Sequence, residues 1–194
     1  MIMKGIHFFT CIFIFFVASS LFAQEESHKI TEHSLKRHKI GAFLGNSLIH
    51  EVHNTQTGKE QYVLAPTFGL DYEYWINQKW AIGTYNEIAH IDIEVQTEEH
   101  EEFIRRENVM LFSAVVVFEP FHNFGIFAGT GIETDPHHTF WIRYLGAEYA
   151  FVRCNNWDVS VAAGYVNKDL YDAFTFGIVV GRRFGKNIPS KGHH

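Results

Sequence analysis

The feature that most constrains the fold of this sequence is a two-residue alternation between large apolar side chains and small or charged ones. Residues 61–76 show it most clearly. Successive side chains of a β-strand point to opposite faces, whereas a helix would mix the two sets. The segment is therefore predicted to be a strand with one apolar face. That face carries Tyr62, Leu64, Pro66, Phe68, Leu70, Tyr72 and Tyr74, and the other carries Ala65, Thr67, Gly69, Asp71 and Glu73.

The same alternation recurs along the chain. Residues 80–95 and 105–119 are also β-like, although both of their faces contain apolar residues. Because segments of about ten alternating residues are typical of membrane-spanning barrels, we expect about eight antiparallel strands. The segments with clean alternation are residues 39–50, 61–76, 123–133, 141–153, 157–165 and 174–184.

The glycines of the clean segments favour a membrane barrel over a soluble sandwich. They lie on the face opposite the large apolar side chains. The interior of a small membrane barrel is crowded and polar, so small and charged residues fit there while apolar side chains face lipid. We therefore predict an all-β, closed, antiparallel up-and-down transmembrane barrel. A soluble secreted lipocalin-like barrel is the structural alternative.

The joins between these segments alternate in length. Outer-membrane barrels have short periplasmic turns and longer external loops, so the alternation predicts which end faces outward. The short joins are residues 77–79, 119–123 and 154–156, and the longer, more polar ones are residues 51–60, 96–105, 133–139 and 167–172.

Aromatic side chains gather beside the short joins, which predicts a girdle at one membrane interface. A partial counterpart is expected at the other rim. The girdle comprises Tyr74, Trp75, Trp80, Phe118, Phe124, Phe151, Trp157 and Phe184, and the counterpart comprises Tyr62, Phe140, Trp141, Tyr165 and Tyr171.

The N-terminus has the pattern of an export signal. Lys4 precedes an apolar run at residues 6–17, and small residues follow before an acidic segment. This predicts a signal peptide at residues 1–23, cleaved after Ala23. A retained membrane helix is the alternative, although the run is short for the roughly 20 residues that a bilayer requires.

Beyond the signal, we expect an N-terminal periplasmic segment at residues 24–38, the barrel at residues 39–184 and a tail at residues 185–194. Cys154 would be the only cysteine of the mature chain, so no disulfide within the chain is expected. The net charge of −6 becomes more negative once Lys4 is removed, which argues against a nucleic-acid partner.

With these features, residues 39–184 resemble the small eight-stranded outer-membrane β-barrel family of bacteria. The resemblance implies a location in the outer membrane, contact with its lipid, and insertion by the barrel-assembly machinery, which is expected to read a terminal strand such as residues 174–184. Phe184 ends that strand with an aromatic side chain, although Arg182 interrupts its apolar face. The resemblance does not imply a particular activity.

Charged residues on the inward faces are expected to form a packed ionic plug. A narrow barrel is filled by side chains, and charges inside it need partners. We therefore interpret this network as structural rather than catalytic. The expected members are Asp71, Glu73, Glu87, Glu148, Asp158 and Arg183, with Arg105 or Arg143 as further partners.

No pattern predicts a metal, a cofactor or a catalytic group. The histidines lack the spacing of a metal site, Ser113 and Ser160 have no evident histidine beside them, and the charged residues 98–106 are interpreted as solvated surface. We therefore expect no enzyme, cofactor or metal. The histidines considered are His28, His33, His38, His50, His53, His137 and His138.

The sequence thus favours a non-enzymatic outer-membrane barrel that presents polar external loops for envelope integrity, adhesion or surface interaction. The partner of the loops is not specified. A narrow pore for small solutes and a lipid-modifying enzyme are the functional alternatives.

Overall fold

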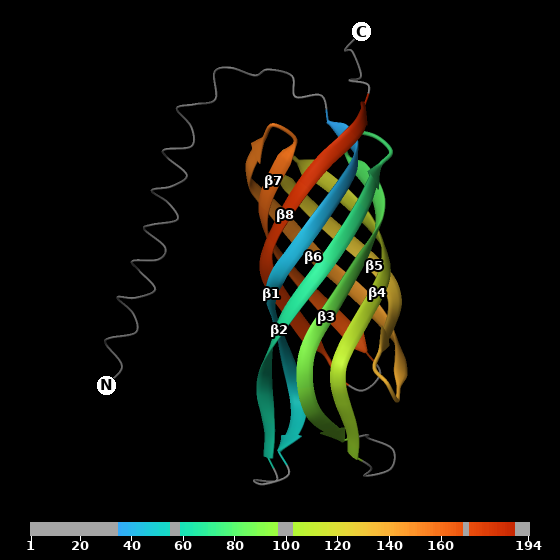
Figure 1. The fold of residues 1–194 in the computed structure, drawn as a ribbon, viewed down its shortest axis with the longest axis vertical. Helices are drawn as coiled ribbons and strands as arrows, with labels where there is room; N and C mark the ends of the chain where they lie inside the picture. Colours follow the sequence, from blue (N-terminus) through green and yellow to red (C-terminus); the bar gives the residue numbers. More distant parts are fainter. Residues whose placement is uncertain (1–34, 55–58, 97–102, 169–170, 189–194) are drawn as a thin grey trace, which may run out of the picture. The chain divides into compact units, whose positions relative to one another are not determined.

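The computed structural model describes residues 35–54, 59–96, 103–168 and 171–188, whose strands form one closed sheet. Each strand pairs antiparallel with the next, and β8 pairs with β1 to close the barrel (Figure 1). The predicted all-β, closed barrel is confirmed. The strands are β1 (Lys36–Asn54), β2 (Lys59–Trp75), β3 (Trp80–Gln96), β4 (Phe103–Phe121), β5 (Phe124–Thr134), β6 (Thr139–Cys154), β7 (Trp157–Lys168) and β8 (Ala173–Asn187).

Several expectations concern residues outside the described ranges. The signal peptide, its cleavage after Ala23 and residues 24–34 and 189–194 lie there, as do His28, His33 and residues 98–102. In the part of the chain that the structure describes, no helix is long and apolar enough to cross a membrane.

The barrel extends beyond the predicted limits at both ends of the chain. β1 starts three residues earlier than expected, and β8 ends three residues later. A register shift at the end of β8 accommodates the added residues, and Gly185 has a φ of 87° there, a conformation open to glycine without steric cost. Beyond it, the amide of Ile188 donates to the carbonyl of Leu35 at 2.7 Å. Parts of the expected periplasmic segment and tail therefore belong to the sheet.

The alternation along β2 matches its orientation in the barrel. Phe68 and Leu70 are 56% and 60% exposed on the outside, whereas Thr67 and Glu73 are buried inside. This is the order expected of a barrel surrounded by lipid, with large apolar side chains outward and small or charged ones inward.

β3 and β4 carry apolar side chains on both faces, so their sequences do not show which face points inward. Ile88 and Phe112 point outward, while Tyr85 and Val115 are buried in the interior. Most interior side chains of these two strands are apolar, so their alternation in polarity is weak. The exceptions are Glu87, Arg106 and Glu119.

One half of the barrel is taller than the other. β4 has 19 residues and β5 only 11, and β4 pairs with β5 only from Met110 onward. Pairing between β2 and β3 likewise ends at the pair of Thr67 with Ala89. The hairpins β1–β2 and β3–β4 therefore project past the barrel at the end opposite the short turns (Figure 1).

Candidate functional site: the barrel interior and its outer surface

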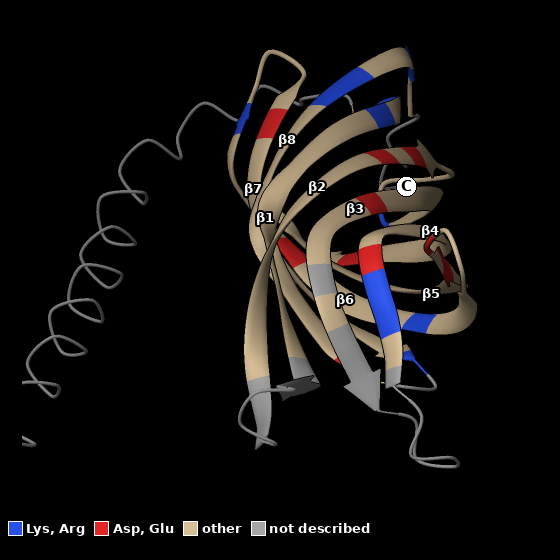
Figure 2. Cartoon of the chain, turned by 60° about the horizontal axis from the view of Figure 1, so that its bottom comes forward, with Lys and Arg blue, Asp and Glu red and all other residues tan. Residues whose placement is uncertain are grey.

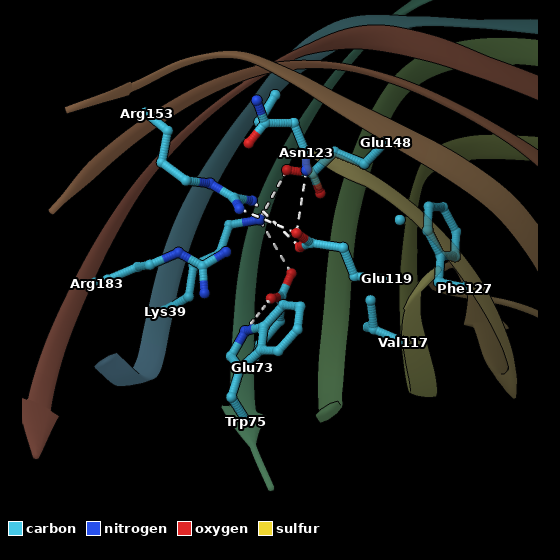
Figure 3. Close-up of a pocket in the computed structure, with 12 residues that line it drawn as sticks. Lys39, Glu73, Trp75, Val117, Glu119, Asn123, Phe127, Glu148, Arg153 and Arg183 are labelled. Atoms are coloured by element: carbon cyan, nitrogen blue, oxygen red, sulfur yellow. Dashed lines mark hydrogen bonds and ion pairs between the residues drawn. The ribbon is translucent and has the colours of Figure 1, made fainter. Parts of the chain in front are cut away.

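A network of ion pairs, which we call the turn-end cluster, fills the interior near the short turns (Figure 3). At its centre the amine of Lys39 contacts Glu73 Oε1 at 3.2 Å and Glu148 Oε1 at 2.7 Å. Glu73 also accepts hydrogen bonds from Trp75 Nε1 at 2.8 Å and from the Tyr85 hydroxyl at 3.0 Å. The cluster consists of Lys39, Glu73, Glu119, Glu148, Arg153, Asp158 and Arg183.

Two arginines, Arg153 of β6 and Arg183 of β8, complete the turn-end cluster. Arg153 binds Glu119 through two nitrogens, at 3.0 and 3.2 Å, and its Nε lies 3.5 Å from Asp158. Arg183 Nε donates to Asp158 at 2.6 Å, and its guanidinium carbon lies 4.8 Å from the ring centre of Trp75. Each carboxylate thus has a cation partner, which is the condition for tolerating ionised groups in a low dielectric.

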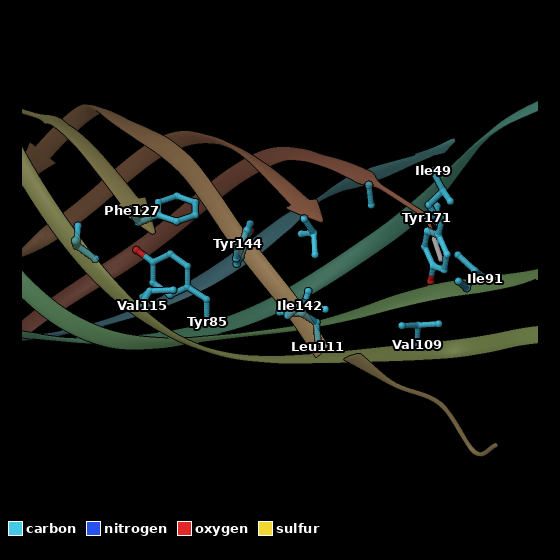
Figure 4. Packing of buried hydrophobic residues seen from close by; sticks show 14 of the residues in the cluster. Ile49, Tyr85, Ile91, Val109, Leu111, Val115, Phe127, Ile142, Tyr144 and Tyr171 are labelled. Carbon is cyan, nitrogen blue, oxygen red and sulfur yellow. The ribbon is translucent and has the colours of Figure 1, made fainter. Parts of the chain in front are cut away.

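An aromatic layer lies next to this cluster, toward the middle of the barrel (Figure 4). It consists of Tyr85, Phe127 and Tyr144, which meet edge to face with centroid distances of 5.0 Å for Tyr85–Phe127 and 5.1 Å for Phe127–Tyr144. Tyr144 also donates to Glu87 at 2.6 Å. A Cβ on Gly164 would come within 2.4 Å of the Tyr144 ring, so the glycine makes room for the layer.

A second network, the loop-end cluster, lies toward the longer loops. Arg106 contacts Glu133 Oε1 at 2.9 Å and Asp135 Oδ2 at 2.7 Å. Lys168 pairs with the other oxygen of Glu133, and Tyr171 donates to Oε1 of Glu133 at 2.7 Å. The loop-end cluster consists of these five residues.

The apolar packing continues around the loop-end cluster. Tyr171 lies among Ile49, Ile91 and Val109 at this end (Figure 4). Three spaces between described interior side chains have room for about one water molecule each. The described interior is thus filled along its length by two ionic clusters and apolar layers.

The structure places all six of the expected interior charges inside the barrel: Asp71, Glu73, Glu87, Glu148, Asp158 and Arg183. The further partners were wrong. Arg105 is exposed and pairs with Glu107, and Arg143 points outward and donates to Asn167.

The cations that pair with the interior carboxylates were missed by the sequence analysis. They are Lys39, Arg106, Arg153 and Lys168. Lys39 shares the inward face of Gly41 and Phe43 in β1, so alternation alone would have found it. Arg106 follows no such rule, because Asn108 has a φ of 46° and the register of β3 and β4 shifts beside it, which reverses the alternation.

The predicted aromatic girdle is correct in part. Trp80, Phe151, Trp157 and Phe184 are 42% to 53% exposed on the outer surface, and Tyr74 and Phe124 are partly exposed. The prediction that Trp75 belongs to the girdle was wrong, because its side chain is only 2% exposed and lies in the interior against Glu73. It shares the inward face of Asp71 and Glu73, and this periodicity outweighs its place beside a turn.

The aromatic side chains predicted for the opposite rim also lie there only in part. Tyr62, Trp141 and Tyr165 are exposed on the outside, whereas Tyr171 is buried in the loop-end cluster. Phe140 stacks under the guanidinium of Arg106, whose carbon lies 4.6 Å from the ring centre.

The arrangement offers no assembled catalytic group among the described residues. Ser113 donates to the backbone carbonyl of Tyr85 at 2.9 Å. His38 contacts the Tyr72 hydroxyl on the outer surface, and Asp135 accepts hydrogen bonds from the backbone amides of His137 and His138. No group of three metal-binding side chains occurs in these ranges, where the side chains of His50 and His53 are not described.

The outer surface is apolar over most strands. Charged residues occupy short stretches of the strands, separated by long uncharged ones (Figure 2). Large apolar side chains that are at least 38% exposed occur on all eight strands. The two faces of the sheet thus have the polarity opposite to that of a soluble barrel.

No protein-family model and no curated protein matches the chain. Among solved structures, it is similar to Ail, the attachment invasion locus protein of Yersinia pestis, at 14% identity and a TM-score of 0.49, over 77% of this chain and 99% of that one. Neisserial surface protein A has 10% identity and a TM-score of 0.45, over 76% and 97%. A de novo designed transmembrane β-barrel has 10% identity and a TM-score of 0.41, over 74% and 94%.

Proposed function

We propose that this chain is a non-enzymatic protein of a bacterial outer membrane, in which the barrel spans the bilayer and the longer loops face outward. The main support for this proposal is the polarity of the two sheet faces, with large apolar side chains outside and charged ones inside. Exposing so many large apolar side chains to water would be unfavourable, whereas lipid accommodates them. The shortest strand, β5, has 11 residues. A tilted strand needs about 9–11 residues to cross a bilayer, so every strand is long enough to do so.

The projecting hairpins support a role at the cell surface. β1–β2 and β3–β4 extend past the shorter strands at the end with the longer loops, so they would stand clear of the lipid. Their tips are polar in sequence. We propose that this half of the barrel presents the contact surface for adhesion or another surface interaction.

The filled interior supports an anchoring role over conduction. Two ionic clusters and the aromatic layer between them leave spaces of about one water molecule, which is too little for a continuous aqueous path. We therefore expect the refolded protein to show no steady open channels in planar bilayers. Steady conductance would favour the narrow pore instead.

Fractionation of the cells that produce the protein tests the location. We expect the full chain in the outer-membrane fraction, with a gel mobility that changes on boiling because the folded barrel resists detergent. Recovery in the soluble periplasm would overturn the membrane proposal and favour the lipocalin-like alternative. Depletion of the barrel-assembly machinery should reduce the amount inserted.

Mass spectrometry of the purified protein tests export. A mature N-terminus at Gln24 would support the proposed signal peptide at residues 1–23. An intact N-terminus would contradict it and favour the retained helix.

A further inference from the structure

A single arginine interrupts the outward apolar row of β8. The row runs through Phe176, Ile178 and Val180, each at least 38% exposed, and Arg182 follows them before Phe184. Arg182 is itself exposed, and no ion pair joins it to a carboxylate of the described residues. A guanidinium on a lipid-facing row is costly unless an anion compensates its charge.

The surroundings of Arg182 are aromatic. It pairs in register with Trp157 of β7 and Ile40 of β1, and its guanidinium carbon lies 5.4 Å from the centre of the Trp157 ring. One step further along, Phe184 stacks on His38 with a centroid distance of 5.2 Å. Trp157 is the first residue of β7, so the group lies at the interface depth on the short-turn side.

More basic groups lie at this rim, and the carboxylates there point inward. On β1, Arg37 donates to the Tyr74 hydroxyl at 3.2 Å, and Lys36 and Lys186 are at the paired ends of β1 and β8. The described carboxylates at this end belong to the turn-end cluster or, as with Asp71, face the interior. We call Arg37, His38, Tyr72, Tyr74, Trp157, Arg182 and Phe184 the rim patch.

We propose that the rim patch binds the phosphate of an anionic glycerophospholipid in the periplasmic leaflet, with Arg182 as its main ligand. The inference rests on the proposed membrane location. The planar guanidinium matches the oxygens of a phosphate in a two-point contact, while the outward side chains of β8 and β1 accommodate an acyl chain. An anionic lipid is favoured over a zwitterionic one because the rim has several basic groups and no outward carboxylate in the described ranges to attract an ammonium.

Lipid selectivity of the refolded full chain tests the proposal. Electron spin resonance compares the association of spin-labelled phosphatidylglycerol with that of spin-labelled phosphatidylcholine in vesicles of phosphatidylcholine. We expect a preference of about fivefold for phosphatidylglycerol, the size expected for one basic side chain at an anionic surface. R182Q should lose most of this preference, and R182K, which keeps the charge, should retain part of it.

R143Q is the matched control. Arg143 also points outward, but it lies on β6 opposite Asn167, toward the longer loops. The proposal is overturned if the wild type shows no preference, or if R143Q lowers it as much as R182Q. If R182Q does not refold, the wild type and R182K still test the proposal. Their preference for phosphatidylglycerol must then weaken at high salt, because salt screens the attraction between a basic side chain and a phosphate.

These results separate the inference from the proposed function. A barrel that inserts into vesicles, with a mobility that changes on boiling, but has no lipid preference contradicts the rim patch alone. A chain that does not insert contradicts the membrane location as well.

Discussion

The two ionic clusters of the interior differ in where their members come from. The turn-end cluster takes every member from a strand, and its ion pairs join β1 to β2 and β6, β4 to β6, and β7 to β8. The loop-end cluster takes Asp135 and Tyr171 from the connections between strands. The first therefore joins strands only, whereas the second joins β5 to β4 and β7 and also attaches two connections to the barrel wall.

This difference indicates that the two clusters stabilise different parts of the molecule. Loss of a pair at the turn end should affect global unfolding, because strands on opposite sides of the interior lose their connection. Loss of a pair at the loop end should mainly release loops and the projecting part of β4. Variants in each cluster, and in the layer between them, test this comparison.

The largest effect is expected from K39M in the turn-end cluster. The substitution leaves the buried carboxylates of Glu73 and Glu148 without their shared cation, and breaking a buried pair in this way costs about 4 kcal/mol. Urea unfolding of the protein refolded in lipid vesicles measures the loss. K79M is the matched control, since Lys79 is exposed in a short turn, and we expect it to unfold as the wild type does. Equal stability of K39M and K79M would contradict the role of the cluster.

A somewhat smaller loss is expected from F127A in the aromatic layer. Removing the ring leaves a cavity between Tyr85 and Tyr144, and the free energy of unfolding should fall by about 3 kcal/mol. The same cavity lies between the two clusters, so F127A should also raise ion leakage through liposomes. F151A removes an outward ring that is 53% exposed and should leave leakage unchanged. Leakage that stays at the wild-type level in F127A would show that the clusters alone close the interior.

A local effect is expected from R106Q in the loop-end cluster. Glu133 keeps its pair with Lys168, but Asp135 loses its cation, so global unfolding should change by no more than about 2 kcal/mol. Hydrogen exchange should instead rise in residues 103–109 of β4 and in the β5–β6 connection. R105Q, which alters the exposed pair with Glu107, should change both readouts by less than about 1 kcal/mol. A global loss in R106Q as large as in K39M would remove the distinction between the clusters.

The turn-end cluster could be largely predicted from the sequence because its members follow the two-residue alternation of regular strands. Glu73, Glu148, Asp158 and Arg183 were all assigned to the interior on that basis. The misplacement of Trp75 shows the limit of composition, since a tryptophan beside a turn is typical of an interface while its parity places it inside.

The loop-end cluster could not be predicted in the same way. Arg106 reaches the interior only because the positive φ of Asn108 and the register shift reverse the alternation of β4. Asp135 and Tyr171 belong to connections, where no periodicity assigns a direction.

The smallest effect on stability is expected from D71N. Asp71 lies between the two clusters. Asp71 is buried on the inward face of β2, yet none of the ion pairs among the described residues includes it. A buried carboxylate without a cation disfavours the folded state, so replacing it with a neutral amide should leave the free energy of unfolding unchanged or raise it by up to about 1 kcal/mol. E73Q is the matched comparison two residues along the same strand. It removes one of the two carboxylates that pair with Lys39 and should lower stability by about 3 kcal/mol. If urea unfolding in vesicles shows equal losses for D71N and E73Q, interior stability depends on carboxylate charge in general and not on the pairs of the turn-end cluster.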